Sequence, residues 1–141
     1  MLTKRQNLLE TIHHGKPDRF VNQYEAFQMV YGTPYTVSAP MAQKGGPSVV
    51  NQWGVTISFP DGMPGPFPVH DEEHIVCKDI TEWRKYVKAP NVIFTPEEWA
   101  PFVAEAEKID RDEYFVTPFV APGVFEQCHY LQEIQNCLMN F

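Results

Sequence analysis

The sequence predicts an α/β fold, because strong helix-start signals and a strand typical of parallel sheets occur in one short chain. Thr3 is followed by Gln6, and Thr95 by Glu98, a spacing that lets the two side chains of each pair cap a helix reciprocally. Residues 114–120 form a nearly continuous apolar run, which is typical of a strand buried on both faces of a parallel sheet. Helices that cover such strands define the α/β class.

Composition excludes several kinds of function. The chain has 141 residues, which fits one domain, and a net charge of −7 with 11 scattered basic residues. Such a chain lacks the clustered positive charge that nucleic acid requires. No apolar run approaches the ~20 residues of a membrane helix, and the N-terminus has no apolar signal-peptide segment. Three cysteines without CxxC spacing do not suggest a disulfide scaffold. We therefore expect a cytoplasmic protein that binds neither nucleic acid nor membrane.

The first third of the chain is predicted to contain a helix, a strand and a second helix. The first helix spans residues 4–14 and ends at Gly15, which can adopt the left-handed conformation of a helix cap. Residues 18–23 are predicted to form the first strand, and residues 24–30 a short helix that Pro34 prevents from continuing. A loop rich in proline, glycine and serine follows.

A β-rich excursion is predicted at about residues 48–77. Its expected strands are residues 49–53, 55–59 and 69–76, with a turn-rich loop at residues 60–66. A hairpin or meander of this kind would decorate a parallel sheet rather than extend it.

The second half is predicted to be mainly helical around the strand at residues 114–120. One helix follows Asp79, another follows Thr95 and is expected to kink at Pro101, and the last begins at Val124. The last helix presents one apolar face, formed by Leu131, Ile134, Leu138 and Met139. Since the chain stops at Phe141 on this face, we expect a piece of a longer domain, the alternative being a terminal helix that docks on its own core.

Two segments resemble the uroporphyrinogen decarboxylase family. Residues 2–9, with His14-Gly15-Lys16-Pro17-Asp18-Arg19, are similar to the opening helix and Gly-x-x-Pro-Asp-Arg turn of that family. Pro122-Gly123-Val124-Phe125-Glu126, followed by Tyr130-Leu131 and Leu138-Met139, is similar to its Gly-Pro-Phe-Glu segment. The resemblance implies that residues 1–141 are the N-terminal part of a (β/α)₈ barrel, a fold that takes about 250 residues when complete.

The family covers two reactions, and the sequence departs from one of them. Where the decarboxylases carry Arg-Gln-Ala-Gly-Arg-Tyr, this chain has Asn22-Gln23-Tyr24-Glu25-Ala26-Phe27, and the family's Phe-Ser-Asp segment is missing. Without such arginines, the carboxylates of a porphyrinogen lose their bidentate partners. The resemblance is therefore nearer to the corrinoid-linked methyltransferase branch. That branch implies zinc and a corrinoid partner for the full-length parent, with zinc ligands in the second half of the barrel.

Three functional hypotheses follow. The first is a fragment of a corrinoid-linked methyltransferase that is inactive by itself, and the second is uroporphyrinogen decarboxylase of porphyrin biosynthesis. The third is a structural or interaction module without catalysis, because no nucleophile is paired with a base in the sequence. Under each hypothesis we expect a homo-oligomer, or association with the missing C-terminal half of the barrel, because a cut barrel exposes strand edges.

In a (β/α)₈ barrel, catalytic and substrate-binding residues are expected at the C-terminal ends of the strands. This rule selects five substrate-binding candidates, with no catalytic residue assigned: Asn22, Tyr24, Glu25, Phe119 and Gly123.

Histidine motifs elsewhere are interpreted as structural. His70 and His74 match the spacing H-x-x-E-H, but the flanking prolines predict a strand, in which these side chains lie about 13 Å apart at ~3.3 Å per residue. Cys128 and His129 are neighbours on a predicted helix and do not face each other. No metal site is predicted in the chain.

Overall fold

The computed structural model describes residues 1–140, which fold into two compact units. The first unit contains residues 1–34 and 94–120, and the second contains residues 35–93 and the chain from residue 121 onward. Both units mix helices with small sheets.

The first unit begins with helix α1, Lys4–Ile12, which Thr3 and Gln6 cap reciprocally as predicted. The helix ends two residues earlier than expected, and His14 rather than Gly15 adopts the left-handed conformation, with φ of 53°. The basic pair at the helix start is not simply solvated. Lys4 lies 4.5 Å from the ring centre of Tyr114, and the Arg5 guanidinium lies 4.8 Å from that of Phe115. These cation–π contacts hold α1 against the segment that enters strand β5.

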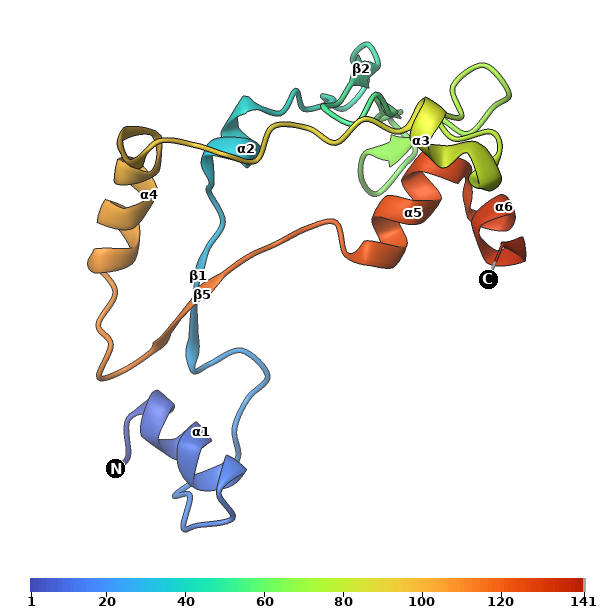
Figure 1. Cartoon of the computed structure of the whole chain (residues 1–141). Helices are drawn as coiled ribbons and strands as arrows, with labels where there is room; N and C mark the ends of the chain where they lie inside the picture. The colour runs from blue at the N-terminus through green and yellow to red at the C-terminus, as the bar shows by residue number, and fades with distance from the viewer. Residues whose placement is uncertain (141) are drawn as a thin grey trace. The chain divides into compact units, whose positions relative to one another are not determined.

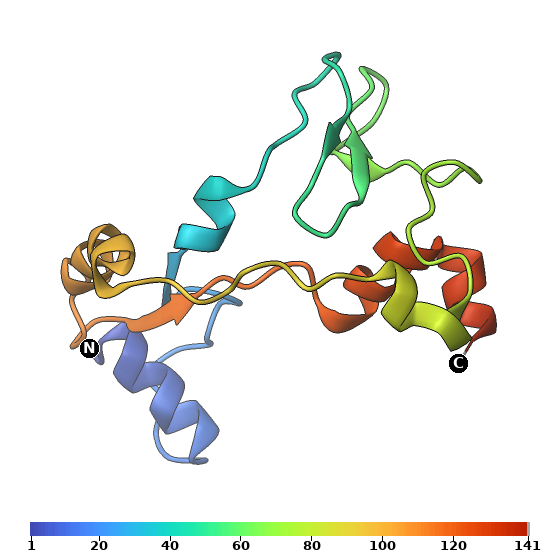
Figure 2. The same cartoon turned by 45° about the horizontal axis from the view of Figure 1, so that its top comes forward.

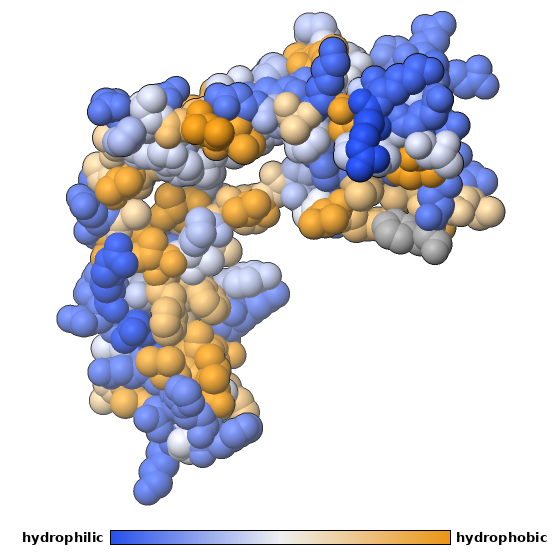
Figure 3. Space-filling view, in the orientation of Figure 1, coloured by the Kyte–Doolittle hydropathy of each residue, from blue (hydrophilic) through white to orange (hydrophobic). Residues whose placement is uncertain are grey.

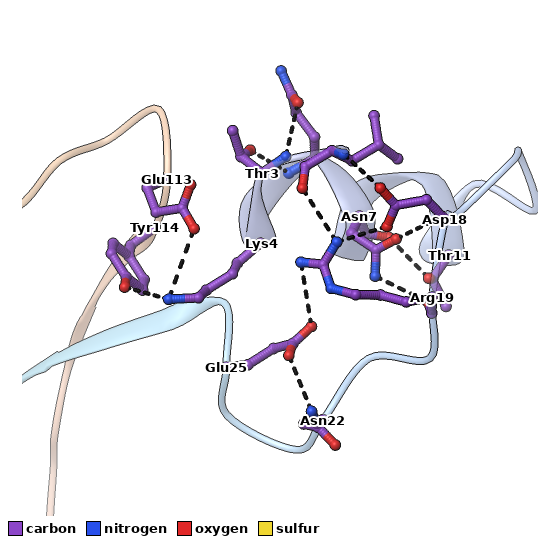
Figure 4. Close-up of polar contacts among 12 residues, drawn as sticks. Thr3, Lys4, Asn7, Thr11, Asp18, Arg19, Asn22, Glu25, Glu113 and Tyr114 are labelled. Carbon is purple, nitrogen blue, oxygen red and sulfur yellow. Dashed lines mark hydrogen bonds and ion pairs between the residues drawn. The ribbon is translucent and has the colours of Figure 1, made fainter.

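Buried Asn7 connects α1 to the turn that follows it (Figure 4). Its side-chain oxygen accepts a hydrogen bond from the Asp18 amide at 2.9 Å, and its Nδ2 donates to the Arg19 carbonyl at 3.0 Å. The Asp18 carboxylate accepts from the Leu2 amide, while Arg19 donates to the Leu2 carbonyl at 3.2 Å. The middle of α1 and the residue before its N-cap are thereby fastened to the Pro-Asp-Arg turn.

Strands β1, Phe27–Val30, and β5, Phe115–Pro118, form a parallel pair in the first unit (Figure 1). Phe27 pairs with Phe115 and Val30 with Pro118. Helix α4, Pro96–Glu107, precedes β5 and packs near the end of β1, where a Cβ added to Gly32 would lie 2.7 Å from the Phe102 ring. Strand, helix and parallel strand thus form a β-α-β crossover.

Sequence reasoning misplaced the first strand. Residues 18–23, predicted as a strand, contain no strand, and the helix predicted at residues 24–30 is replaced by a turn and by β1. The backbone groups of Asp18 and Arg19 are bonded to Asn7, which removes them from any ladder. The four residues of β1 instead find backbone partners on β5, a long-range pairing that local propensity does not reveal.

The second unit contains a three-stranded antiparallel sheet, clearest in Figure 2. Its strands are β2, Val49–Val50, β3, Thr56–Ser58, and β4, Phe67–Pro68, in that order. The first two lie inside predicted strands. The strand predicted at residues 69–76 is wrong, because the Asp71 carboxylate accepts from the Glu73 and His74 amides and bends this segment into turns.

Helices complete the second unit. Helix α2 (Pro34–Ser38) lies at the boundary of this unit in the sequence. The others are the 3₁₀ turn η1 (Ile80–Glu82), α3 (Trp83–Tyr86), α5 (Val124–Gln132) and α6 (Ile134–Met139). The core is small and centres on Val55, Cys77 and Leu131, with Trp53 and Tyr86 packed against it. The Cys77 amide donates to the Leu131 carbonyl at 2.7 Å, which ties the loop before η1 to the end of α5.

Glu133 divides the helix that was predicted to run on from Val124. Its φ of 74° and ψ of 149° belong to a region that side chains rarely adopt. Its carboxylate accepts hydrogen bonds from the Gln135 and Asn136 amides, at 2.9 and 3.0 Å, and so caps α6. The break separates the predicted apolar face, because Leu131 is buried whereas Leu138 and Met139 are exposed.

Apolar surface is abundant on the described residues. Figure 3 shows apolar residues gathered around the path of β1 and β5. Phe20, Tyr31, Phe119 and Val120 are among the exposed large side chains of the first unit. The sheet of β1 and β5 has only two strands, so within residues 1–140 each strand has one edge without a sheet partner. No closed barrel is formed by the described residues.

Removal of the Asn7 side chain is expected to weaken the first unit. Asn7→Ala leaves the Asp18 amide and the Arg19 carbonyl without these partners, and a group left unsatisfied away from water costs about 1–3 kcal/mol. Because both hydrogen bonds are only partly buried, water can replace part of each, and urea denaturation should show a total loss of about 1–3 kcal/mol. Gln23→Ala, which removes an exposed carboxamide, is the control. Equal midpoints for the two variants would contradict the role assigned to Asn7.

The Asp18 carboxylate should make stability depend on pH. The hydrogen bond from the Leu2 amide and the contact with Arg19 lower the pKa of Asp18 below 3.8. Because the folded-state pKa is depressed, the stabilisation is present above the unfolded-state pKa and disappears as pH falls through the folded-state value. The free energy of unfolding, measured by denaturation at pH 6 and at pH 3, should fall less between these two pH values for Asp18→Asn than for the wild type. An equal fall for both proteins would be inconsistent with this assignment.

Candidate functional site

The strongest candidate site is a cavity of about 790 Å³ in the second unit. Gly123, one of the five predicted substrate-binding residues, lies in its wall. Helix α5 contributes Glu126 and Tyr130, and the loop between β2 and β3 contributes Asn51. The remaining wall is largely apolar and includes Ala39, Pro40, Met41, Ala42, Ile57 and Pro66. Concave, mainly apolar sites with a few polar groups are typical of small-molecule binding.

Local structure explains how these polar groups are positioned. Gly123 is the N-cap of α5, and its carbonyl accepts the Gln127 amide at 2.9 Å. A Cβ at Gly123 would lie 2.4 Å from Glu126 Oε2, so the absence of a side chain lets this carboxylate lie over the helix start. The Asn51 carboxamide oxygen accepts the Trp53 and Val55 amides at 2.9 and 3.0 Å, which fixes the turn beside the cavity.

Asn22, Tyr24 and Glu25 lie before β1 rather than after it. This is a correction to the prediction, because the strand begins only at Phe27. Asn22 Nδ2 donates to Glu25 at 3.2 Å, and Glu25 forms an ion pair with Arg19 at 3.9 Å (Figure 4). Tyr24 is exposed. Asn22 and Glu25 thus extend the polar network of α1.

Phe119 is at the expected end of its strand. It follows β5, and its ring lies 5.4 Å from that of Tyr31, which follows β1. Because β1 and β5 are parallel, Asn22 and Glu25 lie at the opposite end of the pair from Phe119. Gly123 belongs to the second unit. Sequence reasoning missed Tyr31, and a correct start for β1 would have identified it.

The H-x-x-E-H segment does not bring its two histidines to one site. His74 Nδ1 lies 2.6 Å from the Asp71 carboxylate, and this hydrogen bond is the main reason why the pKa of Asp71 is lowered. His70 instead lies beside His129 of α5, with 6.2 Å between ring centres. Among residues 1–140, no group of three or more histidine, cysteine or acidic side chains is arranged to hold a metal ion.

The cysteines are free thiols, and two are buried. Burial raises the pKa of Cys77 and of Cys137, which disfavours the thiolate that nucleophilic chemistry needs. These two cysteines therefore serve the packing of the second unit.

Comparisons with protein-family models, curated proteins and solved structures found no match to the chain. Within residues 1–140, every helix is too short or too polar to span a bilayer.

Phe119 is expected to stabilise the first unit through its contact with Tyr31. Aromatic pairs contribute about 0.5–1.5 kcal/mol beyond the area they bury, so Phe119→Ala should destabilise the chain by at least that amount. Neighbouring Val120 is 81% exposed, and Val120→Ala should stay within about 0.5 kcal/mol of wild type. Thermal denaturation provides the comparison, and a Phe119 variant as stable as the Val120 variant would show that the ring contact has no structural role.

Proposed function

We propose that the chain is the N-terminal part of a uroporphyrinogen decarboxylase-like (β/α)₈ barrel whose full-length parent is a corrinoid-linked methyltransferase. The β-α-β crossover of β1, α4 and β5 supports this proposal most directly, since it is the unit from which such barrels are built. Helix α1 and its Pro-Asp-Arg turn precede the crossover in the order that the family resemblance implies. The sheet strands β2–β4 then belong to an insertion within the crossover.

The wall of the cavity also favours the methyltransferase branch over the decarboxylases. Among residues 1–140, the only charged side chain in this wall is Glu126, and no lysine or arginine contributes to it. A porphyrinogen carries several carboxylates, which this surface would repel rather than bind. We place the substrate in this cavity, with Gly123 and Glu126 in its wall.

The family's zinc is not assigned to this chain. Its ligands are a His-x-Cys and a later cysteine, and no His-x-Cys occurs in the sequence. The isolated chain is therefore proposed to be inactive. We propose the cytoplasm as its location, because free Cys77, Cys128 and Cys137 suit a reducing compartment.

Two assays of the full-length parent test this function. Incubated with a methylated corrinoid and a thiol acceptor, it should transfer the methyl group, whereas with uroporphyrinogen it should release no carbon dioxide. The isolated chain should be inactive in both assays. Efficient decarboxylation by the parent would favour the decarboxylase alternative and exclude the methyltransferase.

An interaction module without catalysis is the second candidate. Within the described residues, β1 and β5 each have one edge without a strand partner, and Phe119 and Val120 are exposed nearby in the chain. Both features favour this candidate, because unpaired strands and apolar surface promote association. Under either function we expect the isolated chain to form homo-oligomers or to bind the rest of the barrel.

Sedimentation velocity over a range of micromolar concentrations checks this association. The sedimentation coefficient should rise with concentration, and Val120→Ser should shift the rise to higher concentration by removing exposed apolar surface. Ile93→Ser, at a similarly exposed position in the second unit, is the matched control. A monomer at every concentration would contradict the expected association.

A further inference from the structure

A groove in the first unit runs between strand β1 and helix α4. Its volume is about 470 Å³, and one wall consists of consecutive residues of β1 and the chain just after it: Gln28, Met29, Val30, Tyr31 and Gly32. The opposite wall is formed by α4 and the chain just after it, through Pro101, Phe102, Glu105 and Ile109. Successive side chains of a strand point to opposite faces of a sheet, so a wall of consecutive residues follows the backbone edge of β1 rather than one face.

This edge of β1 is the one that β5 leaves free. The Val30 carbonyl accepts the Phe119 amide at 2.9 Å, and the Ala26 carbonyl is bonded to β5 in the same way. Because backbone groups alternate along a strand, the amide and carbonyl of Met29 point to the other side. Among residues 1–140, no residue of β5 lines the groove. Backbone donors and acceptors without a strand partner in the described sheet therefore face the groove at Met29.

An extended peptide has the chemistry that fits such a groove. Its backbone supplies the hydrogen-bonding groups that the free edge of β1 lacks, and alternate side chains supply specificity. On one face of the peptide these side chains meet Phe102 and Ile109, which are half-buried in the wall. The edge of β1 in a second copy of the chain fits less well, because α4 already lies beside it.

The charge of the groove favours a basic peptide. Among the described residues, Glu105 is the only charged side chain in the wall, and the whole chain has a net charge of −7. Glu105 lies 3.6 Å from Lys108, but these two side chains are 70% and 73% exposed, and exposed pairs of this kind contribute little. A lysine or arginine of the peptide can therefore replace Lys108 as the partner of Glu105.

We propose that the groove between β1 and α4 binds an extended peptide segment by strand addition. The peptide pairs with the backbone of Met29, places apolar side chains against Phe102 and Ile109, and places a basic side chain near Glu105. This site belongs to the second candidate function, an interaction module, and rests on it. It involves neither the cavity at Gly123 nor methyl transfer.

Selection from a library of random peptides displayed on phage, with the purified chain immobilised, supplies the probe. Enriched peptides should alternate apolar and polar residues and include lysine or arginine. A selected peptide carrying a fluorescent label is then titrated with the chain, and fluorescence anisotropy gives the Kd. Proline at the centre of the peptide should weaken binding by about tenfold or more, because it removes a backbone donor and leaves its acceptor unpaired.

Amide hydrogen exchange locates the bound peptide. The Met29 amide should become protected when the peptide is added, because it points into the groove. The Val30 amide should change little, since it faces β5. The Val116 amide should also change little, since it lies on the outer edge of β5 and away from the groove.

Two pairs of variants test the contacts. Met29→Pro removes the outward amide and keeps the bonds of β1 to β5, so it should weaken peptide binding by about tenfold or more. Met29→Ala keeps this amide and should weaken binding less. Glu105→Gln should weaken binding by about two- to fivefold. Glu107→Gln, which removes an exposed charge of α4 outside the groove, should leave binding unchanged. Protection of the Phe119 amide establishes that β1 and β5 remain paired in each variant.

Two outcomes would overturn the proposal. One is that no selected peptide binds the folded wild type more tightly than Met29→Pro. The other is protection of the Met29 amide that grows with chain concentration in the absence of peptide, since a second copy would then occupy the groove. A chain that fails in the peptide selection can still self-associate in sedimentation, so failure of this site is distinct from failure of the interaction module.

Discussion

The pairing of β1 with β5 is the constraint on which the first unit depends. It joins Phe27 to Phe115 across an intervening segment that includes most of the second unit. Parallel strands require a crossover, and α4 provides it. Parallel sheets are also normally covered on both faces and continued at both edges, whereas here the described sheet ends after two strands. The same pairing therefore orders the first unit and, within the described residues, leaves one edge of each strand without a partner.

Polar contacts hold together segments that a large hydrophobic core would hold together in other proteins. The fully buried side chains include Asn7, whose hydrogen bonds hold the turn after α1, and the core of the second unit centres on three residues. Glu25 and Asn22 extend the Asn7 network, so residues first interpreted as substrate ligands have a structural explanation.

Sequence reasoning succeeded where local chemistry decides structure. Both threonine capping boxes occur as expected, because the partners lie three residues apart, and β5 lies within its predicted apolar run. It failed where distant partners decide. The position of β1 depends on its pairing with β5. The bend at Asp71 arises because its carboxylate accepts hydrogen bonds from nearby amides that a strand would use for sheet pairing. The break at Glu133 depends on a strained backbone conformation. Of the cavity wall, Gly123 had been selected from the sequence, whereas the approach of Asn51 to Glu126 and Tyr130 depends on tertiary structure alone.

The central claim is that β1 and β5 are the inner part of a larger parallel sheet. Amide hydrogen exchange at Val116 tests it most directly, since alternation turns this amide away from β1. The Phe115 amide instead donates to the carbonyl of Ala26, just before β1, and the Phe119 amide donates to that of Val30 in β1. In the dilute chain, Val116 should exchange much faster than Phe115 and Phe119, and it should become protected as concentration rises or when the rest of the barrel is added. Protection of Val116 equal to that of Phe115 in the dilute monomer would contradict the claim.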